Sequence, residues 1–142
     1  MKPIVSIIMP ALNEASTIAQ TLQSARMLET CGLNIELIVV DGGSQDNTKD
    51  VAQPLADHVI DAPRGRARQM NAGAAKATGD YLMFLHADTR LTTQAATELQ
   101  HTFTQNPVWG RFDVCIEGQP LMLRVISFMM NLRSRLTGIA TG

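Results

Sequence analysis

Three short polar segments of this chain carry side chains that could bind an anionic ligand and a metal ion. They are Asp41-Gly42-Gly43-Ser44, Arg64-Gly65-Arg66-Ala67-Arg68 and His86-Ala87-Asp88. Carboxylates accept hydrogen bonds from hydroxyl and N–H groups, arginines bind phosphate oxygens, and carboxylate oxygens are ligands for hard divalent cations. If the fold brings these segments together, they suit a nucleoside linked to a diphosphate.

A carboxylate at Asp41 can accept the imide N–H of a uracil base or a ribose hydroxyl. The glycines after it would let a ligand come close to the backbone. The same residues could instead only build a turn, with Ser44 capping the next helix. The spacing excludes a calcium loop, and no GxGxxG follows the first apolar run, which argues against a dinucleotide-binding Rossmann site.

The arginines at 64, 66 and 68 lie just before or within the start of a helical pattern, where the helix dipole favours acids. An anion would offset that placement, and a pyrophosphate is the natural candidate. A solvated basic loop is the alternative interpretation. The small residues of the same helix indicate close packing on a sheet rather than a site; they are Ala72, Gly73 and Ala77.

Asp88 follows the most apolar run of the chain, residues 81–85, which we expect to be a buried strand. A carboxylate there could hold a divalent cation that bridges two phosphates and neutralises a leaving diphosphate. Without a ligand, an arginine or water, a buried Asp88 would be costly. A histidine such as His86 is more often a hydrogen-bonded structural residue than a metal ligand, so both roles stay open.

Short apolar runs predict four strands, over residues 4–9, 35–40, 58–60 and 81–85, and an alternating pattern over 111–117 predicts a half-covered strand. Helical patterns lie between them. This alternation predicts an α/β fold with a mainly parallel, Rossmann-like sheet and helices on both faces. Ligands of such sheets bind beyond the carboxyl ends of the strands, so the polar segments should converge on one edge.

The helices have sequence signals at their ends. Asn13 is the expected cap of the first helix, which should end at Cys31-Gly32 with Ile18, Leu22 and Ala25 on its buried face. Ser44 is the expected cap of the second helix. Further helices are predicted over 66–78, closed by Gly79, over 93–104 and over 121–136.

The chain has 142 residues and a net charge of -1, so no global field draws it toward nucleic acid. Its length suits one domain with a core of its own. The two cysteines, Cys31 and Cys115, lie too far apart for a redox or metal motif and are expected to be small buried hydrophobes in a reducing cytoplasm. We see no signal peptide or membrane span and expect a cytoplasmic protein with no nucleic-acid partner.

Four segments, in this order, resemble the family 2 glycosyltransferases of the GT-A fold. They are SIIMPALNEA, IVVDGGSQDNT, GRARQMNAGAAKATGDYLMFLHADT and, more weakly, GRFDV, and they cover about residues 4–117. The HADT ending and the RGRARQMN stretch are similar to a bacterial subgroup often described as selenodomain-associated. The resemblance implies transfer of a sugar from a nucleoside-diphosphate sugar, above all a UDP-sugar, to the hydroxyl of an unknown acceptor, with inversion.

The resemblance also implies roles for single residues. Pro10, Asn13, Glu14 and Asp41 would line the nucleoside pocket. The basic segment with Arg64 and Arg66 would lie near the donor.

Asp88 matches the last acid of the family's DXD motif, which holds Mn²⁺ or Mg²⁺ against the diphosphate. His86 replaces the first acid, and this puts a strict metal requirement in doubt although an imidazole can still ligate Mn²⁺.

Family members carry their general base, usually an Asp, in the second half of the domain. We therefore expect residues 1–117 to be the nucleotide-sugar-binding half and 118–142 the truncated start of the acceptor-binding region, with the base beyond residue 142. Such a chain should bind donor with little or no turnover.

Two other functions remain open. A nucleotidyltransferase shares a related sheet but usually has a glycine-rich, basic loop after the first strand, which PALNEA is not. A non-catalytic nucleotide-sugar-binding module would explain the altered metal motif and the missing base. The helix over 121–136, with three arginines, could rest on the inner face of a membrane or pack against a further part of the protein.

Overall fold

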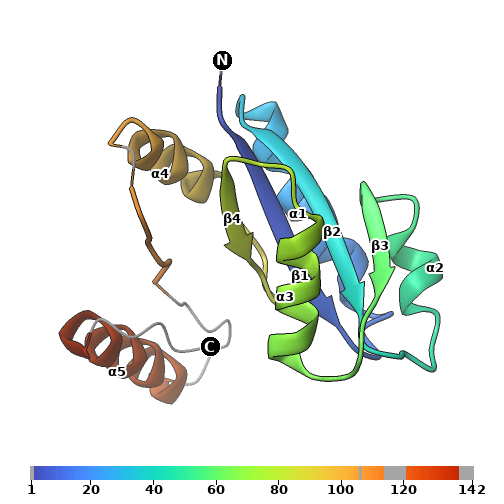
Figure 1. Ribbon diagram of the computed structural model, residues 1–142. Helices are drawn as coiled ribbons and strands as arrows, with labels where there is room; N and C mark the ends of the chain where they lie inside the picture. Colours follow the sequence, from blue (N-terminus) through green and yellow to red (C-terminus); the bar gives the residue numbers. More distant parts are fainter. Residues whose placement is uncertain (1, 106, 114–120, 138–142) are drawn as a thin grey trace. The chain divides into compact units, whose positions relative to one another are not determined.

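The computed structural model describes residues 2–105, 107–113 and 121–137, and the chain divides into two compact units, Met1–Gln105 and Asn106–Gly142. The first unit is an α/β unit and the second contains one described helix (Figure 1). In chain order the elements are β1 (Ile4–Ala11), α1 (Ile18–Thr30), β2 (Asn34–Asp41), α2 (Thr48–Ala52), β3 (His58–Asp61), α3 (Arg66–Lys76), β4 (Tyr81–Phe84), α4 (Thr93–Phe103) and α5 (Leu121–Thr137).

The four strands form one parallel sheet in the order β3-β2-β1-β4, which confirms the predicted α/β class. The register aligns Ala11 of β1 with Asp41 of β2, and Asp41 with Asp61 of β3. Three carboxyl ends therefore finish level with one another. The loops that follow them start from the same edge of the sheet.

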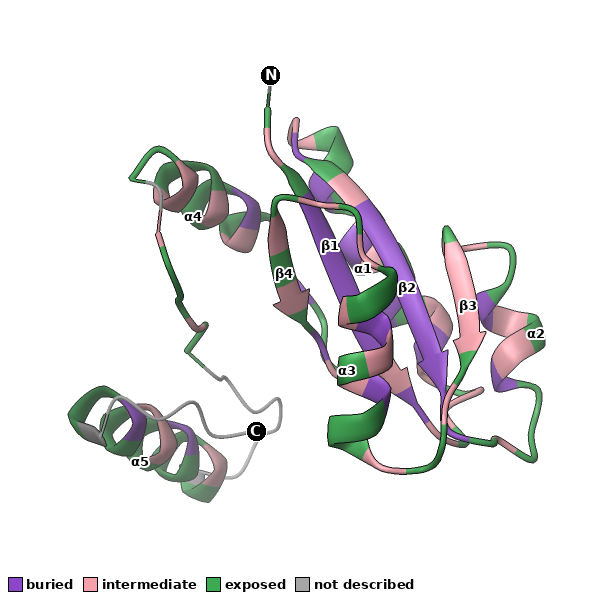
Figure 2. Ribbon diagram, in the orientation of Figure 1, coloured by how far each residue is buried: buried purple, intermediate pink, exposed green. Residues whose placement is uncertain are grey.

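Helices cover both faces of the sheet, and β1 and β2 are therefore buried on both sides (Figure 2). The face under α1 includes the predicted stripe of Ile18, Leu22 and Ala25, all fully buried. On the other face α3 packs its alanines on Ile8, Ile38 and Val40. Alternate side chains of each strand thus enter two separate cores.

Gly73 sets how closely α3 approaches the sheet. A Cβ at this position would lie 2.4 Å from Cγ2 of Ile8 and 3.0 Å from Cγ2 of Val40. Only a glycine fits there without a shift of the buried strands. The close packing predicted from the small residues of this helix is confirmed.

Two predicted N-terminal helix caps are wrong. Asn13 does not cap α1, which begins at Ile18 after Thr17, and its backbone has a left-handed φ of 56°. Ser44 does not cap α2 either, because α2 begins at Thr48, whose N–H donates 3.0 Å to the carboxylate of Asp46. In both places the polar side chain is held by a partner in another loop, which local capping patterns cannot show.

β4 is less buried than its apolar sequence predicts. It is an edge strand of the described sheet, and Leu82 and Phe84 are 47% and 46% exposed because α3 packs on β1 and β2. Of the strand predicted over 111–117, the described residues 111–113 have no regular structure, and 114–117 lie outside the described residues.

The second unit contains α5, which begins where the helix was predicted and ends one residue later than the predicted 121–136. Within this unit Arg111 donates to the backbone oxygen of Asn131 at 3.3 Å, and Asp113 forms ion pairs with Arg111 and Arg135. Large apolar side chains of α5 are exposed, among them Phe128 at 64%. Across the described ranges, no helix has both the length and the apolar character needed to cross a membrane.

A buried carboxylate, Glu36 on β2, holds the turn between α3 and β4 on the sheet. It accepts hydrogen bonds from the hydroxyl of Ser6 and, at 2.9 Å each, from the N–H and hydroxyl of Thr78. The Ser6 oxygen in turn accepts the N–H of Gly79 at 2.9 Å.

α3 ends at Lys76, so Gly79 is not its C-terminal cap, contrary to the prediction from the sequence. A Cβ on Gly79 would lie 2.7 Å from the Ile4 carbonyl oxygen, which explains this glycine.

Burial alone would raise the pKa of Glu36, but the hydrogen bonds from Ser6 and Thr78, with the nearby His58, hold it below its ordinary value of 4.5. A carboxyl whose pKa is lower in the folded than in the unfolded state stabilises the fold above its unfolded pKa. That stabilisation is lost as the pH falls through the folded pKa.

We therefore expect the free energy of unfolding, measured with urea from about pH 5 down to about pH 3, to fall more steeply in the wild type than in Glu36→Gln. The control is Asp50→Asn, which changes an exposed carboxylate and should keep the wild-type slope. Equal slopes in the wild type and Glu36→Gln would show that this carboxylate does not contribute to the pH dependence.

Candidate functional site

A cavity of about 260 Å³ opens in the first unit where β1 ends, α3 begins and β4 gives way to its loop. It is therefore at the edge of the sheet where a ligand was predicted. Its lining residues come from three segments far apart in the sequence: Pro10, Ala11, Leu12 and Glu14; Arg64, Gly65, Arg66 and Gln69; and His86, Ala87 and Asp88.

Six of the eight predicted site residues line this cavity: Pro10, Glu14, Arg64, Arg66, His86 and Asp88. Asn13 and Asp41 are not among its lining residues; Asn13 lies in the loop after β1, and Asp41 is the last residue of β2.

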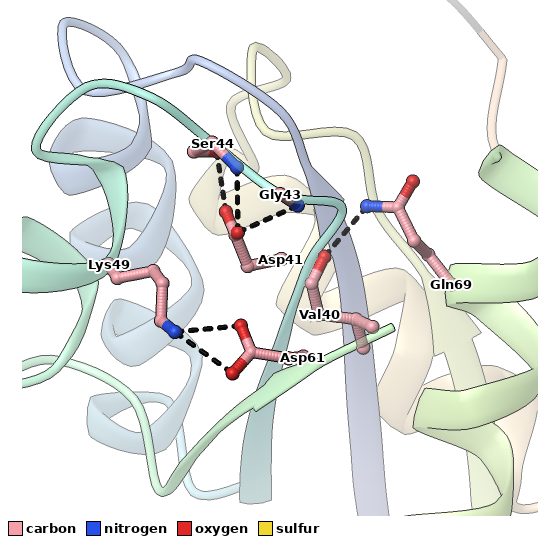
Figure 3. A network of polar contacts seen from close by, with 7 residues as sticks. All are labelled: Val40, Asp41, Gly43, Ser44, Lys49, Asp61 and Gln69. Atoms are coloured by element: carbon pink, nitrogen blue, oxygen red, sulfur yellow. Dashed lines mark hydrogen bonds and ion pairs between the residues drawn. The ribbon is translucent and has the colours of Figure 1, made fainter. Parts of the chain in front are cut away.

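The carboxylate of Asp41 is occupied by its own turn. The side chain is 1% exposed, and one oxygen accepts the N–H groups of Gly43 at 2.9 Å and Ser44 at 2.8 Å (Figure 3). The other oxygen accepts the Ser44 hydroxyl. The turn-building role considered from the sequence is therefore present, and contact with a base remains a prediction.

Asn13 joins two loops at the rim of the site. Its amide oxygen accepts the N–H of Gln45 at 2.8 Å, and its own N–H donates to the Ser44 hydroxyl at 2.9 Å. One residue later, the N–H of Glu14 donates to the Thr48 hydroxyl at 2.8 Å. The loop after β1 is thus fixed to the loop after β2, and its position follows the strand register.

Arg64 and Arg66 bring two positive charges to the lining of the cavity. Both side chains are exposed, and no carboxylate of the described residues lies within ion-pair distance of either. Arg66 is also the first residue of α3, so the positive end of the helix dipole adds to the two guanidinium groups. This combination suits a phosphate or diphosphate. Arg68, the third arginine, is exposed and is not part of the lining.

His86 and Asp88, in the loop after β4, also line the cavity. Asp88 is exposed, and one of its oxygens accepts the Thr89 hydroxyl at 3.4 Å, a long contact. Within the described ranges no three His, Cys, Asp or Glu side chains come together as a metal cluster. A cation held here would thus take one or two ligands from this loop and the others from phosphate oxygens and water, which is usual for Mg²⁺. The residues fit such a cation.

Gln69 is the lining residue that the sequence analysis missed. It is 4% exposed, and its amide nitrogen donates to the carbonyl oxygens of Ala11 and Val40, at 2.8 Å each. Its spacing in the sequence could have identified it. Gln69 stands four residues before Gly73, so it lies on the same face of α3, the face that packs on the sheet.

An ion pair also lies at this edge of the sheet. Nζ of Lys49, on α2, is 2.7 and 2.9 Å from the carboxylate oxygens of Asp61, the last residue of β3 (Figure 3). The hydrogen bonds and charge of Asp61 raise the pKa of Lys49. Both side chains are exposed and outside the cavity lining.

A second cavity, of about 320 Å³, lies near the amino ends of β1 and β2. It is lined by Lys2, Pro3, Gly32, Leu33, Gln100, Phe103 and Thr104. It is larger than the first, but Lys2 is its one charged residue and no acid accompanies it. We therefore assign the chemistry to the smaller cavity.

Cys31, beside Gly32, is a free and partly buried cysteine, and Cys115 lies outside the described residues.

Comparison with known proteins gives a consistent result. The sequence pattern of glycosyl transferase family 2 matches residues 6–140. A PGL/p-HBAD biosynthesis glycosyltransferase of Mycobacterium bovis is 41% identical over 96 residues, which cover 63% of this chain and 37% of that protein.

Two solved structures are similar to this chain. Glucosyl-3-phosphoglycerate synthase from Mycobacterium tuberculosis, in complex with Mn²⁺, UDP and glucosyl-3-phosphoglycerate, has a TM-score of 0.53 and 28% identity over 60% of this chain and 33% of its own. Mannosyltransferase PcManGT from Pyrobaculum calidifontis, with GDP-Man and Mn²⁺, has a TM-score of 0.56 and 26% identity over 66% and 30%. The chain thus spans about a third of the length of these proteins.

The strained loop at Asn13 can be tested separately from any ligand. Asn13→Ala removes the bond to Gln45 and places an alanine in a left-handed conformation, so it should lower the free energy of unfolding by roughly 1–3 kcal/mol. Asn13→Gly removes the same bond without the strain and should lower it less. Urea denaturation measures both.

The control is Gln45→Ala, which keeps the backbone N–H that Asn13 accepts and should leave the stability near that of the wild type. An Asn13→Ala variant as stable as Asn13→Gly would contradict the assignment of strain.

Proposed function

Because the chain belongs to glycosyl transferase family 2, we propose that it forms the donor-binding part of a glycosyltransferase and binds a nucleoside-diphosphate sugar. The observation that carries this proposal is a cavity lined both by two arginines without ion-pair partners among the described residues and by His86 and Asp88. The predicted resemblance to this family and to its GT-A fold is confirmed.

The diphosphate is the best-supported part of the ligand. Arg64 and Arg66 offer planar sets of N–H donors, and the first turn of α3 offers backbone N–H groups at the positive end of the helix. A diphosphate would neutralise all three. A neutral sugar or a free nucleoside would leave them without a counter-charge.

Asp88, with His86 beside it, would hold a Mn²⁺ or Mg²⁺ ion against the diphosphate. When bound, the ion supplies a positive charge that stabilises the leaving nucleoside diphosphate. Both similar structures contain Mn²⁺ with a nucleotide, UDP in one and GDP-Man in the other. Because one carboxylate replaces the usual two, we propose that the cation assists donor binding rather than being an absolute requirement.

The nucleoside would lie beyond the ends of β1 and β2, against Pro10, Glu14 and the loop that Asp41 organises. A UDP-sugar is our first choice of donor, since the similar glucosyl-3-phosphoglycerate synthase is solved in complex with UDP. GDP- and dTDP-sugars are the alternatives.

We propose that the general base and the acceptor-binding residues are not among the described residues that line this cavity. Glu14 and Asp88 are the carboxylates that line the cavity within the described residues. Glu14 already accepts the hydroxyl of Thr17 at 2.8 Å, and Asp88 is assigned to the cation. Inverting transfer needs a further carboxylate to take the acceptor's proton. We propose that this chain alone binds donor but transfers sugar slowly or not at all.

We also propose that α5 rests on the inner face of an anionic membrane. Its exposed side chains include Met122, Phe128 and Leu136, and its charged residues are all arginines. A cationic amphipathic helix lies in the lipid interface with its apolar face down.

Donor binding is tested by calorimetric titration of the chain with UDP, GDP and dTDP, each with and without Mn²⁺. We expect UDP to bind most tightly and Mn²⁺ to strengthen its binding. Arg66→Ala should weaken UDP binding about ten- to a hundredfold, because each hydrogen bond between charged groups contributes about 1.5–3 kcal/mol. Asp88→Asn should remove the effect of Mn²⁺.

Arg68→Ala is the matched control, since it removes the same charge from the same segment outside the cavity. Equal losses for Arg66→Ala and Arg68→Ala would mean that only the general charge matters. Absence of binding to all three nucleotides would refute the proposed function, whereas donor binding with no transfer by the complete protein would support a binding module.

Membrane contact is tested by flotation with vesicles of phosphatidylcholine, with and without phosphatidylglycerol. We expect the chain to float with the anionic vesicles only, and Phe128→Asp to abolish this. Gln94→Asp, on the exposed surface of α4, adds the same charge and should have no effect. A chain that stays with the soluble fraction in both cases would remove α5 as a membrane-binding element.

A further inference from the structure

We propose that Gln69 is a positioning residue for the diphosphate: its buried amide holds the arginine-bearing turn of α3 against the ends of β1 and β2. This inference rests on the proposed function, because it assigns a role to the way in which Arg64 and Arg66 are held.

The contacts of Gln69 suit a carboxamide. The NH₂ group has two hydrogens, and two carbonyl oxygens, those of Ala11 and Val40, lie 2.8 Å from its nitrogen (Figure 3 shows the bond to Val40). The amide oxygen faces the N–H of Gly65 at 3.4 Å. One side chain therefore connects the last residue of β1, the penultimate residue of β2 and the residue between the two arginines.

The turn has few other attachments to the sheet. Ala62 donates its N–H to the Asp41 carbonyl oxygen at 2.9 Å, and Pro63 has no N–H to donate. The next hydrogen bonds are those between Gly65 and Gln69, in which the Gln69 N–H also donates to the Gly65 carbonyl oxygen at 2.9 Å. The position of Arg64 and Arg66 relative to the strand ends thus depends on the Gln69 amide.

The rest of α3 has its own anchor. Gly73 and the alanines of the buried face pack on Ile8 and Val40 one turn further along. Loss of the Gln69 amide should therefore loosen the first turn of α3 and leave the helix on the sheet. Donor affinity should then fall in a protein that is still folded.

Gly42 provides an independent test, because it occupies the space beside the amide. A Cβ on Gly42 would lie 3.0 Å from Cδ, Nε2 and Oε1 of Gln69. The backbone of Gly42 is not in the left-handed region, and the nearest contacts of an alanine Cβ there are all with this side chain. Gly42→Ala should displace the amide without removing any polar group.

The experiment measures UDP affinity by calorimetry in the presence of EDTA, so that the arginine side of the site is observed without Mn²⁺. We expect Gln69→Ala to weaken UDP binding about tenfold while the circular dichroism spectrum stays that of the wild type. Adding Arg66→Ala to Gln69→Ala should then cost much less affinity than Arg66→Ala alone, because the arginine is already misplaced. A purely structural role of Gln69 predicts independent, additive losses.

Gly42→Ala should also weaken UDP binding in the wild-type background but have no further effect when combined with Gln69→Ala. Gln69→Glu places a carboxylate against two carbonyl oxygens, so it should bind UDP weakly at neutral pH and more tightly as the pH falls and the carboxyl group becomes protonated.

The two proposals fail in different ways. If the wild type binds UDP and folded Gln69→Ala and Gly42→Ala bind it equally well, the role of Gln69 is refuted and the proposed function stands. If the wild type binds no nucleotide, the proposed function itself fails. Should Gln69→Ala not fold, Gly42→Ala decides, and unchanged UDP affinity in that folded variant refutes the inference.

Discussion

The site depends on the register of β1 and β2, two parallel strands that are buried on both faces and end level with each other. Because Ala11 pairs with Asp41, the backbone groups that leave the sheet do so at one edge, where ladder partners run out. Those groups need other partners. The loops after the strands, and the helix that begins beside them, are arranged by that need as much as by the hydrophobic cores.

At this edge of the sheet some polar groups have hydrogen-bond partners within the protein, and two charged side chains have no ion-pair partner among the described residues. The amide of Gln69 donates hydrogen bonds to the carbonyl oxygens of Ala11 and Val40. The turn after β2 donates hydrogen bonds to the carboxylate of Asp41. Arg64 and Arg66, on either side of Gly65, have no ion-pair partner among the described residues. Gln69 ties the backbone that carries the arginines to the strand ends, so part of the ordering that an anion would otherwise require is already present before binding.

The sequence was sufficient for the buried strands and for most of the cavity, because apolar runs and polar segments at strand ends are local signals. It failed where the partner is distant. Asn13 and Ser44 bond to each other across 31 residues, so capping statistics misplaced both. Gly79 fits against Ile4 and Ser6, not at a helix end. β4 is apolar but lies at the edge of the described sheet, and composition does not reveal a strand's place in a sheet.

Charge balance explains why His86 in place of an acid is compatible with the family's chemistry. A site with one carboxylate attracts a free cation less than a site with two, because each removed negative charge weakens the Coulomb attraction. The two arginines lower that attraction further. A donor diphosphate reverses the sign of the local potential, so on the proposed function the cation and the diphosphate are mutually dependent ligands. On the same proposal Asp88 would orient a cation whose binding energy comes mostly from the phosphates, and no second carboxylate would be needed at position 86.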